Sequence, residues 1–297
     1  MQRIHPLILV ILPFVSTSAA EEKDPTRLLS EAVQAKRAAK FDVARALATQ
    51  ALTTCSAAIT QRPDDQKLYA QRSTAHSLLM DFEKAIADLN KSMELGAEPV
   101  NIYDERGDLY FKFGKFKEAV ADYDRFLKLE PRFTPRHWRR GIAYYYTKQF
   151  VEGQKQFEGY QTFDSNDVEN AVWRYLCMAR KFGPAKARNV LLKIGDDRRV
   201  PMRQIYELFA GNLKPDDVLD AARAGNPSPE KLNRQLFYAH LYLGLYFETE
   251  KKVDLARQHM FRAEEKRIGH FMWDVAHLHA ELFRQETKRK EAQKNSR

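Results

Sequence analysis

The chain has 297 residues and a formal net charge of +9, because 49 Lys and Arg side chains outnumber 40 Asp and Glu. This length allows a large hydrophobic core. No long segment alternates apolar and polar residues with period two, so we expect almost no β-strand. The positive charge alone does not indicate a nucleic-acid partner, because no segment matches a nucleic-acid recognition module.

Residues 1–20 have the three parts of a secretory signal peptide. Arg3 supplies the positive start, residues 4–15 form an apolar stretch, and the small residues 18–20 precede Glu21. The apolar stretch is too short to span a bilayer. We therefore expect export, cleavage before Glu21, and a soluble protein in the periplasm or cell envelope. The alternative is an apolar N-terminal helix of a cytosolic protein.

Residues 21–65 predict an N-terminal helical hairpin, with helices over 25–39 and 42–61. Ala51 and Pro63 fit a repeat spacing that becomes clearer further along the chain. The residues before them fit this spacing poorly. We therefore expect a variant of the unit that follows.

Residues 66–167 contain three consecutive windows with the same pattern, and the copy at 100–133 is the best. It has an aromatic, a small residue and an aromatic in its first half, then an Ala, an aromatic and a Pro. These positions are Tyr103, Gly107, Tyr110, Ala119, Tyr123 and Pro131. The window at 66–99 has Tyr69, Ser73, His76, Ala85 and Leu89 at matching places, and the window at 134–167 has His137, Gly141, Tyr144, Gly153 and Phe157. This spacing is similar to that of the tetratricopeptide repeat (TPR), whose unit is about 34 residues long.

The pattern has a mechanical explanation, because two antiparallel helices approach closely only where their side chains are small. We expect Gly107 to face the region of Ala119, and Gly141 to face Gly153. Pro131 cannot continue a helix and therefore ends the second helix of its repeat. A single hairpin cannot bury its apolar face, so the hairpins stack. The predicted fold is all-α, a TPR-type α-solenoid of antiparallel helical hairpins.

The repeat weakens over residues 168–232, where Gly and Pro interrupt the pattern. We expect an irregular helical segment there, with short helices over 203–208 and 216–224. The pattern returns over 233–283, where Gly244 and Ala256 occupy the small positions of a further TPR-like hairpin. A helix over 271–283 is expected to cap the stack.

Residues 284–297 form a basic tail with six basic and two acidic side chains. We expect this tail to fray into solvent, or to contact an anionic surface such as lipid headgroups. The two cysteines, Cys55 and Cys177, belong to hairpins about three units apart. A disulfide needs Cα atoms closer than ~7 Å. We therefore expect two unpaired, half-buried thiols.

The residues indicate no catalytic set, cofactor or metal site. Asp104 and Asp108 share a helix face, but no third group converges on them by sequence. His277 and His279 are two residues apart, which directs them about 200° apart on a helix. We therefore expect no enzyme, although an active site within residues 168–232 is a third alternative to the two binding functions considered below.

The predicted partner site is the concave groove, which the first helix of each TPR hairpin lines. The window at 134–167 contributes Pro135, Trp138, Ile142, Tyr145 and Tyr146, and the window at 100–133 contributes Asn101, Asp104, Asp108, Phe111 and Lys112. Aromatic side chains beside the two acidic residues Asp104 and Asp108 fit a protein or peptide partner. Alternatively, Trp138 and Tyr145 are covered by residues 168–232 folded back over them.

Together, the leader and the repeats resemble the bacterial NlpI-type TPR lipoproteins, over roughly residues 32–283. The stretches that carry the resemblance are 137–167 and 241–283. It implies an adaptor in the bacterial envelope that assembles peptidoglycan hydrolases and a processing protease, usually as a homodimer. The lipidated cysteine of that family has no counterpart here, so we expect no lipid tether. The alternative function is a peripheral binder that uses the basic tail on anionic lipid or polymer.

Overall fold

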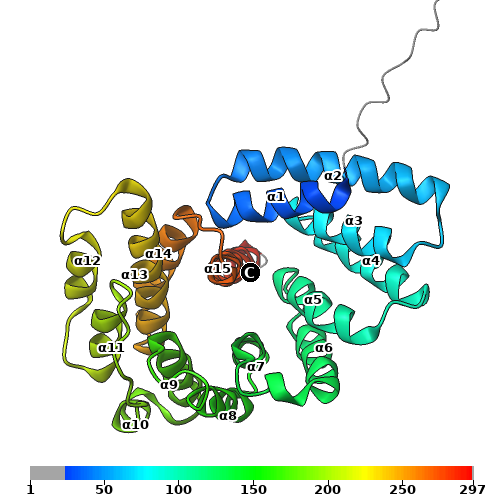
Figure 1. The fold of residues 1–297 in the computed structure, drawn as a ribbon. Coiled ribbons are helices and arrows are strands. Elements are labelled where there is room, and N and C mark those ends of the chain that lie inside the picture. Colours follow the sequence, from blue (N-terminus) through cyan, green and yellow to red (C-terminus); the bar gives the residue numbers. More distant parts are fainter. Residues whose placement is uncertain (1–23, 296–297) are drawn as a thin grey trace, which may run out of the picture.

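The computed structural model describes residues 24–295, and every regular element among them is helical (Figure 1). In chain order the α-helices are α1 (Pro25–Arg37), α2 (Phe41–Gln61), α3 (Gln66–Leu78), α4 (Phe82–Glu94), α5 (Pro99–Lys112), α6 (Phe116–Leu129), α7 (Trp138–Tyr146), α8 (Phe150–Tyr160), α9 (Val168–Phe182), α10 (Pro184–Asn189), α11 (Met202–Ala210), α12 (Pro215–Arg223), α13 (Pro229–Thr249), α14 (Val253–Glu265) and α15 (Phe271–Asn295), with the 3-10 turn η1 (Pro131–Phe133) before α7. The all-α prediction is confirmed, whereas the predicted signal peptide lies outside the described residues.

The three predicted repeats form the hairpins α3/α4, α5/α6 and α7/α8 in the predicted register. A Cβ atom on Gly107 would lie 2.6 Å from the Tyr123 ring, and one on Gly141 would lie 2.6 Å from Phe157. One on Gly153 would lie 3.4 Å from the carbonyl oxygen of Gly141, so these two glycines do face each other. Gly107 and Gly141 therefore leave room for the aromatic ring of the second helix to reach the backbone of the first helix.

Each repeat also contains a polar bridge between its two helices, which was not predicted from the sequence. Arg72 binds Asp88 at 2.7 Å, and Arg106 binds Asp122 at 2.6 Å. In the third repeat Arg140 donates to the amide oxygen of Gln156 at 2.6 Å. The separation along the chain is the same in all three bridges, and the arginines recur with the period of the repeat. The same periodicity that revealed the glycines could have revealed this bridge.

The irregular segment contains four helices, and α9 is its structural centre. All residues of α9 from Val168 to Ala179 are buried. This helix stacks on α8 as the first helix of another repeat would, so a Cβ atom on Gly153 would lie 2.7 Å from the Cys177 sulfur. The helices α11 and α12 lie close to their predicted positions, and α13 and α14 form the predicted returning hairpin, in which a Cβ atom on Gly244 would lie 3.3 Å from the carbonyl oxygen of Ala256.

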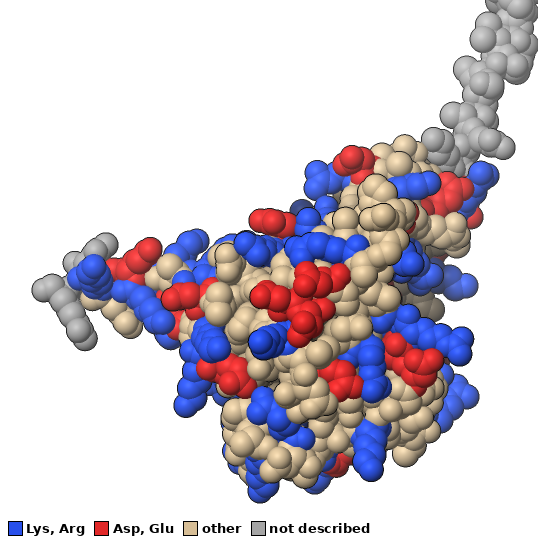
Figure 2. All heavy atoms as spheres, turned by 90° about the vertical axis from the view of Figure 1, so that its left-hand side faces the viewer, with Lys and Arg blue, Asp and Glu red and all other residues tan. Residues whose placement is uncertain are grey.

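The hairpins follow one another around a ring, and α15 runs through the middle of it (Figure 1). This position corrects the prediction that the last helix caps the end of the stack. The predicted boundary at residue 284 is also wrong, because the helix continues without a break to Asn295. Its first half is buried inside the ring, while its last residues are exposed and project from the body (Figure 2).

The ring closes where the turn before α15 meets the turn after α1. A Cβ atom on Gly269 would collide with the backbone of Lys36, so the two turns touch through their main chains. The guanidinium of Arg267 lies 4.1 Å from the centre of the Phe41 ring and contacts the Met80 sulfur. The first and last hairpins of the solenoid are therefore in contact.

Both cysteines are free, as predicted, but they are fully buried rather than half-buried. Burial raises the pKa of the Cys55 thiol to about 11 and that of Cys177 further still. Within residues 24–295 no helix combines the length and apolar character that crossing a membrane requires.

Two buried histidines connect α13 to α14. The Nδ1 atoms of His240 and His259 are 3.0 Å apart, so one nitrogen donates a proton that the other accepts. Burial lowers the pKa of His240 to about 3 and that of His259 to about 4, and the neighbouring His259 adds to the effect on His240. The folded protein therefore keeps both rings neutral at mildly acidic pH.

This pair should make the protein sensitive to acid. In the unfolded chain both histidines take up protons near pH 6.5, whereas the folded protein resists protonation until about pH 4. The stability that the neutral pair contributes is therefore complete above pH 6.5 and falls as the pH decreases. Between pH 7 and pH 5 we expect the free energy of unfolding to fall by about 2–4 kcal/mol from this pair. The double variant His240→Gln/His259→Gln, measured by urea unfolding, should lose this part of the pH dependence; an unchanged dependence contradicts the assignment.

The repeat register can be tested at Ala119, which is completely buried between α5 and α6. The change Ala119→Glu should destabilise the protein by several kcal/mol, about 3–5, because it buries a carboxylate where there is no space for it. Lys117→Glu, on the exposed face of the same helix, should change stability by less than about 0.5 kcal/mol. Equal melting temperatures for the two variants would show that the register is wrong.

Candidate functional site

The predicted groove residues divide into a covered set and an open set. Phe111, Ile142 and Tyr145 are buried, and Tyr146 is half-buried. The cover over Phe111 is α15, whose Phe271 ring lies 5.1 Å from that of Phe111. The central part of the concave surface therefore contacts α15 of the same chain.

Polar contacts hold α15 in this position. The Tyr146 hydroxyl is 3.0 Å from Nδ1 of His279, and the Lys112 ammonium is 4.0 Å from a carboxylate oxygen of Asp274. Lys112 also lies over the Phe271 ring, 5.7 Å from its centre. Tyr146 and Lys112, both predicted to line the groove, therefore contact α15 of the same chain instead.

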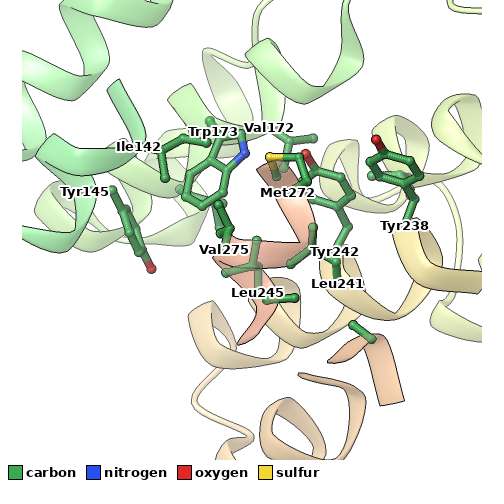
Figure 3. Packing of buried hydrophobic residues seen from close by; sticks show 14 of the residues in the cluster. Ile142, Tyr145, Val172, Trp173, Tyr238, Leu241, Tyr242, Leu245, Met272 and Val275 are labelled. Atoms are coloured by element: carbon green, nitrogen blue, oxygen red, sulfur yellow. The ribbon is translucent and has the colours of Figure 1, made fainter. Parts of the chain in front are cut away.

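Tyr145 is buried at a junction of three helices. Its ring meets Trp173 of α9 edge to face, with 5.5 Å between the ring centres, and its hydroxyl donates to Glu248 of α13 at 3.4 Å. Figure 3 shows Ile142 and Tyr145 beside Trp173, with Val275 of α15 close by. The alternative that the irregular segment covers Tyr145 therefore describes part of the arrangement, and α13 completes it.

The open part of the concave side is a cleft of about 580 Å³, which we call the aromatic groove. It lies between α5, α7, the turn after α8 and the start of α15. Its lining residues are Asp104, Asp108, Phe126, Phe133, Arg136, His137, Trp138, Arg139, Tyr160, Phe163 and Phe271. Phe163 is 55% exposed, and Trp138 is half-buried against Phe271, with 5.4 Å between ring centres. Asn101, also predicted for the site, is exposed but does not line this groove.

Arg139 pairs with Asp104 and Asp108, the two acidic residues predicted for the groove. Its guanidinium contacts Asp104 at 2.7 Å and Asp108 at 2.5 Å. Nδ1 of His137 accepts the backbone N–H of Arg140, so Nε2 carries the proton and donates to Asp104 at 2.8 Å. Burial disfavours ionisation of Asp104, but the hydrogen bond from His137 and the charge of Arg139 outweigh it and hold its pKa below the usual value.

A smaller cavity of about 180 Å³ lies next to the aromatic groove and shares Trp138 and Tyr160 with it. We call it the inner cavity. Its other lining residues are Phe157, Asp167, Glu169, Asn170, Trp173, Arg199, His270 and Met272. This cavity was not predicted, because Glu169 and Arg199 lie in the irregular segment, where no repeat indicates their positions.

One arginine serves three carboxylates beside the inner cavity. Arg199 contacts Asp167 and Asp197 at 2.6 Å each and Glu169 at 2.7 Å. The other oxygen of Glu169 accepts the Tyr242 hydroxyl at 2.7 Å. Burial raises the pKa of Glu169 to about 7, although the charge of Arg199 opposes this shift. The cavity wall is therefore polar, with two acidic side chains and one basic side chain among its lining residues.

Within residues 24–295 one group of side chains has a spacing that suits a metal ion, namely Glu264, His277 and Glu281. Arg284 already contacts both of these glutamates, and His277 contacts Glu264 at 2.7 Å. Arg284 and His277 therefore supply the counter-charge and hydrogen bonds that a metal ion would otherwise supply. His279 points elsewhere, toward Tyr146, as its spacing of two from His277 on one helix requires.

The chain is similar to a known repeat family and to several solved structures. Residues 100–133 match the tetratricopeptide repeat family. A TPR protein from Parabacteroides merdae is similar in structure, with a TM-score of 0.51 at 13% identity over 85% of this chain and 96% of that one. PilF from Pseudomonas aeruginosa has a TM-score of 0.42 at 11% identity, over 86% of this chain and 97% of that one. Yeast Tom70 has a TM-score of 0.47 at 14% identity, over 92% of this chain and 66% of that one.

The fold is thus an α-solenoid of the TPR class. The chain contains a tetratricopeptide repeat at 100–133, the copy with the clearest pattern. Repeats of this class generally serve as scaffolds for protein–protein interaction.

The stability of single variants can distinguish covered residues from open ones. Tyr145→Ala should destabilise the protein by about 3–5 kcal/mol, because it leaves a cavity among buried aromatics. Phe163→Ala should cost less than about 1 kcal/mol, because that ring is largely exposed. Urea unfolding of the two variants checks this difference. A fully stable Tyr145→Ala protein would show that α9 and α13 do not cover this position.

Proposed function

We propose that the protein is a non-enzymatic adaptor that binds a protein or peptide partner in the aromatic groove. The observation that carries this proposal is the exposed ring of Phe163 beside the half-buried rings of Phe133 and Trp138, in a part of the concave side that α15 leaves open. Exposed apolar area in a concave surface is typical of an interaction site. The TPR scaffold supports the same conclusion.

The groove also has a defined charge pattern. Asp104 and Asp108 are engaged by Arg139, so they contribute little negative charge to a partner. The exposed Arg136 lies over Phe133, 4.2 Å from the ring centre, and 5.8 Å from the centre of Phe163. The groove therefore presents aromatic faces and one accessible positive charge. These features favour a partner segment with apolar side chains and an acidic neighbour.

We propose the cell envelope as the setting, on the evidence of the signal-like residues 1–20 and the resemblance to NlpI-type lipoproteins. Under this proposal the partners are envelope hydrolases or proteases, and the adaptor acts as a homodimer. Edman sequencing of the native protein should begin Glu-Glu-Lys-Asp. Recovery of an intact Met1 from a cytosolic fraction contradicts export.

A second candidate function uses the projecting end of α15. The exposed residues there include Lys288, Arg289, Lys290 and Lys294. Figure 2 shows basic side chains on the projection, with acidic ones between them. A positively charged helix end can bind anionic lipid or polymer, and salt screens such binding over about 8 Å at physiological ionic strength. Binding that disappears with added salt favours this alternative.

The experiment that tests the groove is capture of the partner by photo-cross-linking from position 163. A photoreactive amino acid at Phe163 should cross-link the partner in the native envelope. The same amino acid at Val43, which is 50% exposed on α2, should not.

The captured partner then allows a quantitative test. The double variant Phe133→Ala/Phe163→Ala should weaken binding at least ~10-fold while the melting temperature stays near that of the wild type. Val43→Ala is the matched control and should bind normally. Normal binding by the groove variant, together with loss on Lys288→Gln/Arg289→Gln/Lys290→Gln, would transfer the function to the end of α15.

A further inference from the structure

Two buried polar atoms, both on residues that line the inner cavity, have no hydrogen-bond partner among residues 24–295. They are the indole Nε1 of Trp173 and the amide oxygen of Asn170, on side chains that are 1% and 2% exposed. The Asn170 amide nitrogen donates to the backbone oxygen of Phe157 at 3.0 Å, and this bond fixes which end of the amide is unpaired. Buried polar groups are almost always hydrogen-bonded, to protein or to a bound molecule, so an unpaired donor and an unpaired acceptor on residues of one cavity are positions where a ligand can form hydrogen bonds.

In Figure 3 the indole nitrogen of Trp173 points toward the side where Met272 lies. Met272 is another lining residue of the inner cavity. The unpaired donor is therefore directed into the cavity and away from the Tyr145 ring on its other side.

The charged side chains around the inner cavity indicate which charge the ligand carries. Asp167 and Glu169 line the cavity, and Arg199, the cation in its wall, contacts both of them and also Asp197. His270, the remaining titratable group in the wall, has its pKa lowered by burial and by the charge of Arg199. A ligand that brings a positive charge and hydrogen-bond donors therefore suits this wall better than an anion.

The aromatic residues strengthen this conclusion. Trp138, Phe157, Tyr160 and Trp173 form the apolar walls of the cavity, and aromatic faces attract an ammonium group. An ammonium alone leaves the Trp173 donor unpaired, so the ligand also needs an acceptor, such as a carbonyl oxygen next to the ammonium. A free carboxylate is disfavoured by the neighbouring acids. The volume of about 180 Å³ is slightly larger than the ~150 Å³ of a cavity that holds benzene, which is enough for one small residue.

We propose that the inner cavity binds the N-terminal residue of a polypeptide, with its ammonium group at the Asn170 oxygen and the acidic wall, and its first carbonyl oxygen at the Trp173 indole nitrogen. The rest of the polypeptide leaves past Trp138 and Tyr160 into the aromatic groove, which shares these two side chains. This assignment rests on the proposed function and adds to it a chemical identity for the end of the partner.

The first test uses glycinamide, which carries an ammonium group beside a carbonyl and no carboxylate. Isothermal titration should show that glycinamide binds, with N-acetylglycinamide and glycine at least ~10-fold weaker. The pentapeptide amide Gly-Ser-Gly-Ser-Gly should bind when its N-terminus is free. Acetylation of that N-terminus should weaken its affinity at least ~10-fold. Failure of glycinamide to bind at millimolar concentration overturns the proposal. A cavity that accepts glycinamide and excludes the free pentapeptide is a small-amine site, which overturns the assignment to polypeptides.

The second test separates a ligand contact from a structural role. Trp173→Phe keeps the ring and removes the unpaired N–H, so it should weaken glycinamide at least ~5-fold without lowering the melting temperature. The matched control is Trp273→Phe, because Nε1 of Trp273 donates to the Glu264 backbone oxygen at 2.8 Å outside the cavity. That control should lose stability and bind glycinamide normally. Unchanged binding by Trp173→Phe overturns the geometry proposed here.

The two proposals fail in distinguishable ways. Glycinamide reports on the inner cavity alone, and Phe133→Ala/Phe163→Ala should not affect it, because neither ring lines the cavity. Weak partner binding by that variant, with glycinamide binding intact, supports both proposals. If glycinamide binds and the variant binds its partner normally, the groove proposal fails while the cavity remains an amine site.

Discussion

The insertion of α15 through the ring is the contact on which the rest of the molecule depends. A TPR solenoid normally leaves its concave side free, but here the first half of α15 lies inside it, with Val275, Ala276 and Ala280 completely buried. Because this helix covers the central aromatics, it converts predicted binding residues into core. It also creates the two sites that remain, since Phe271 forms one wall of the aromatic groove and Met272 forms one wall of the inner cavity.

The recurring arginine bridge shows how polar groups fix the register of an apolar stack. Arg106 and Asp122 are both buried, and the guanidinium also lies over Tyr103 and Tyr110. A buried ion pair contributes little net stability, because desolvation of the two charges offsets most of their attraction. A wrong pairing of the two helices would leave both charges unpaired in the core, which costs far more. We infer that the bridge mainly selects the correct register of the two helices and adds little to the stability of the fold.

The repeats could be predicted from the sequence because their cause is local. Gly107 and Tyr123 are in one hairpin, so a fixed spacing along the chain becomes a fixed contact in space. The covering of Phe111 could not be predicted in this way, because Phe271 lies far along the chain and no spacing rule connects the two rings. The inner cavity was missed for the same reason, since Arg199 reaches Asp167 across an irregular segment. Local periodicity thus predicted the scaffold, while the sites depend on where one distant helix packs.

The position of α15 after all the repeat hairpins that it packs against has a consequence for biosynthesis. A polypeptide emerges from the ribosome or a translocation channel with its N-terminus first, so the repeats can form before their central helix exists. During that interval the rings of Phe111 and Tyr146 face an empty ring interior. They are then a surface that a chaperone can hold, or that a second nascent chain can enter with its own last helix. The arrival of α15 after the repeats therefore decides whether the ring is filled by its own chain or by a neighbour.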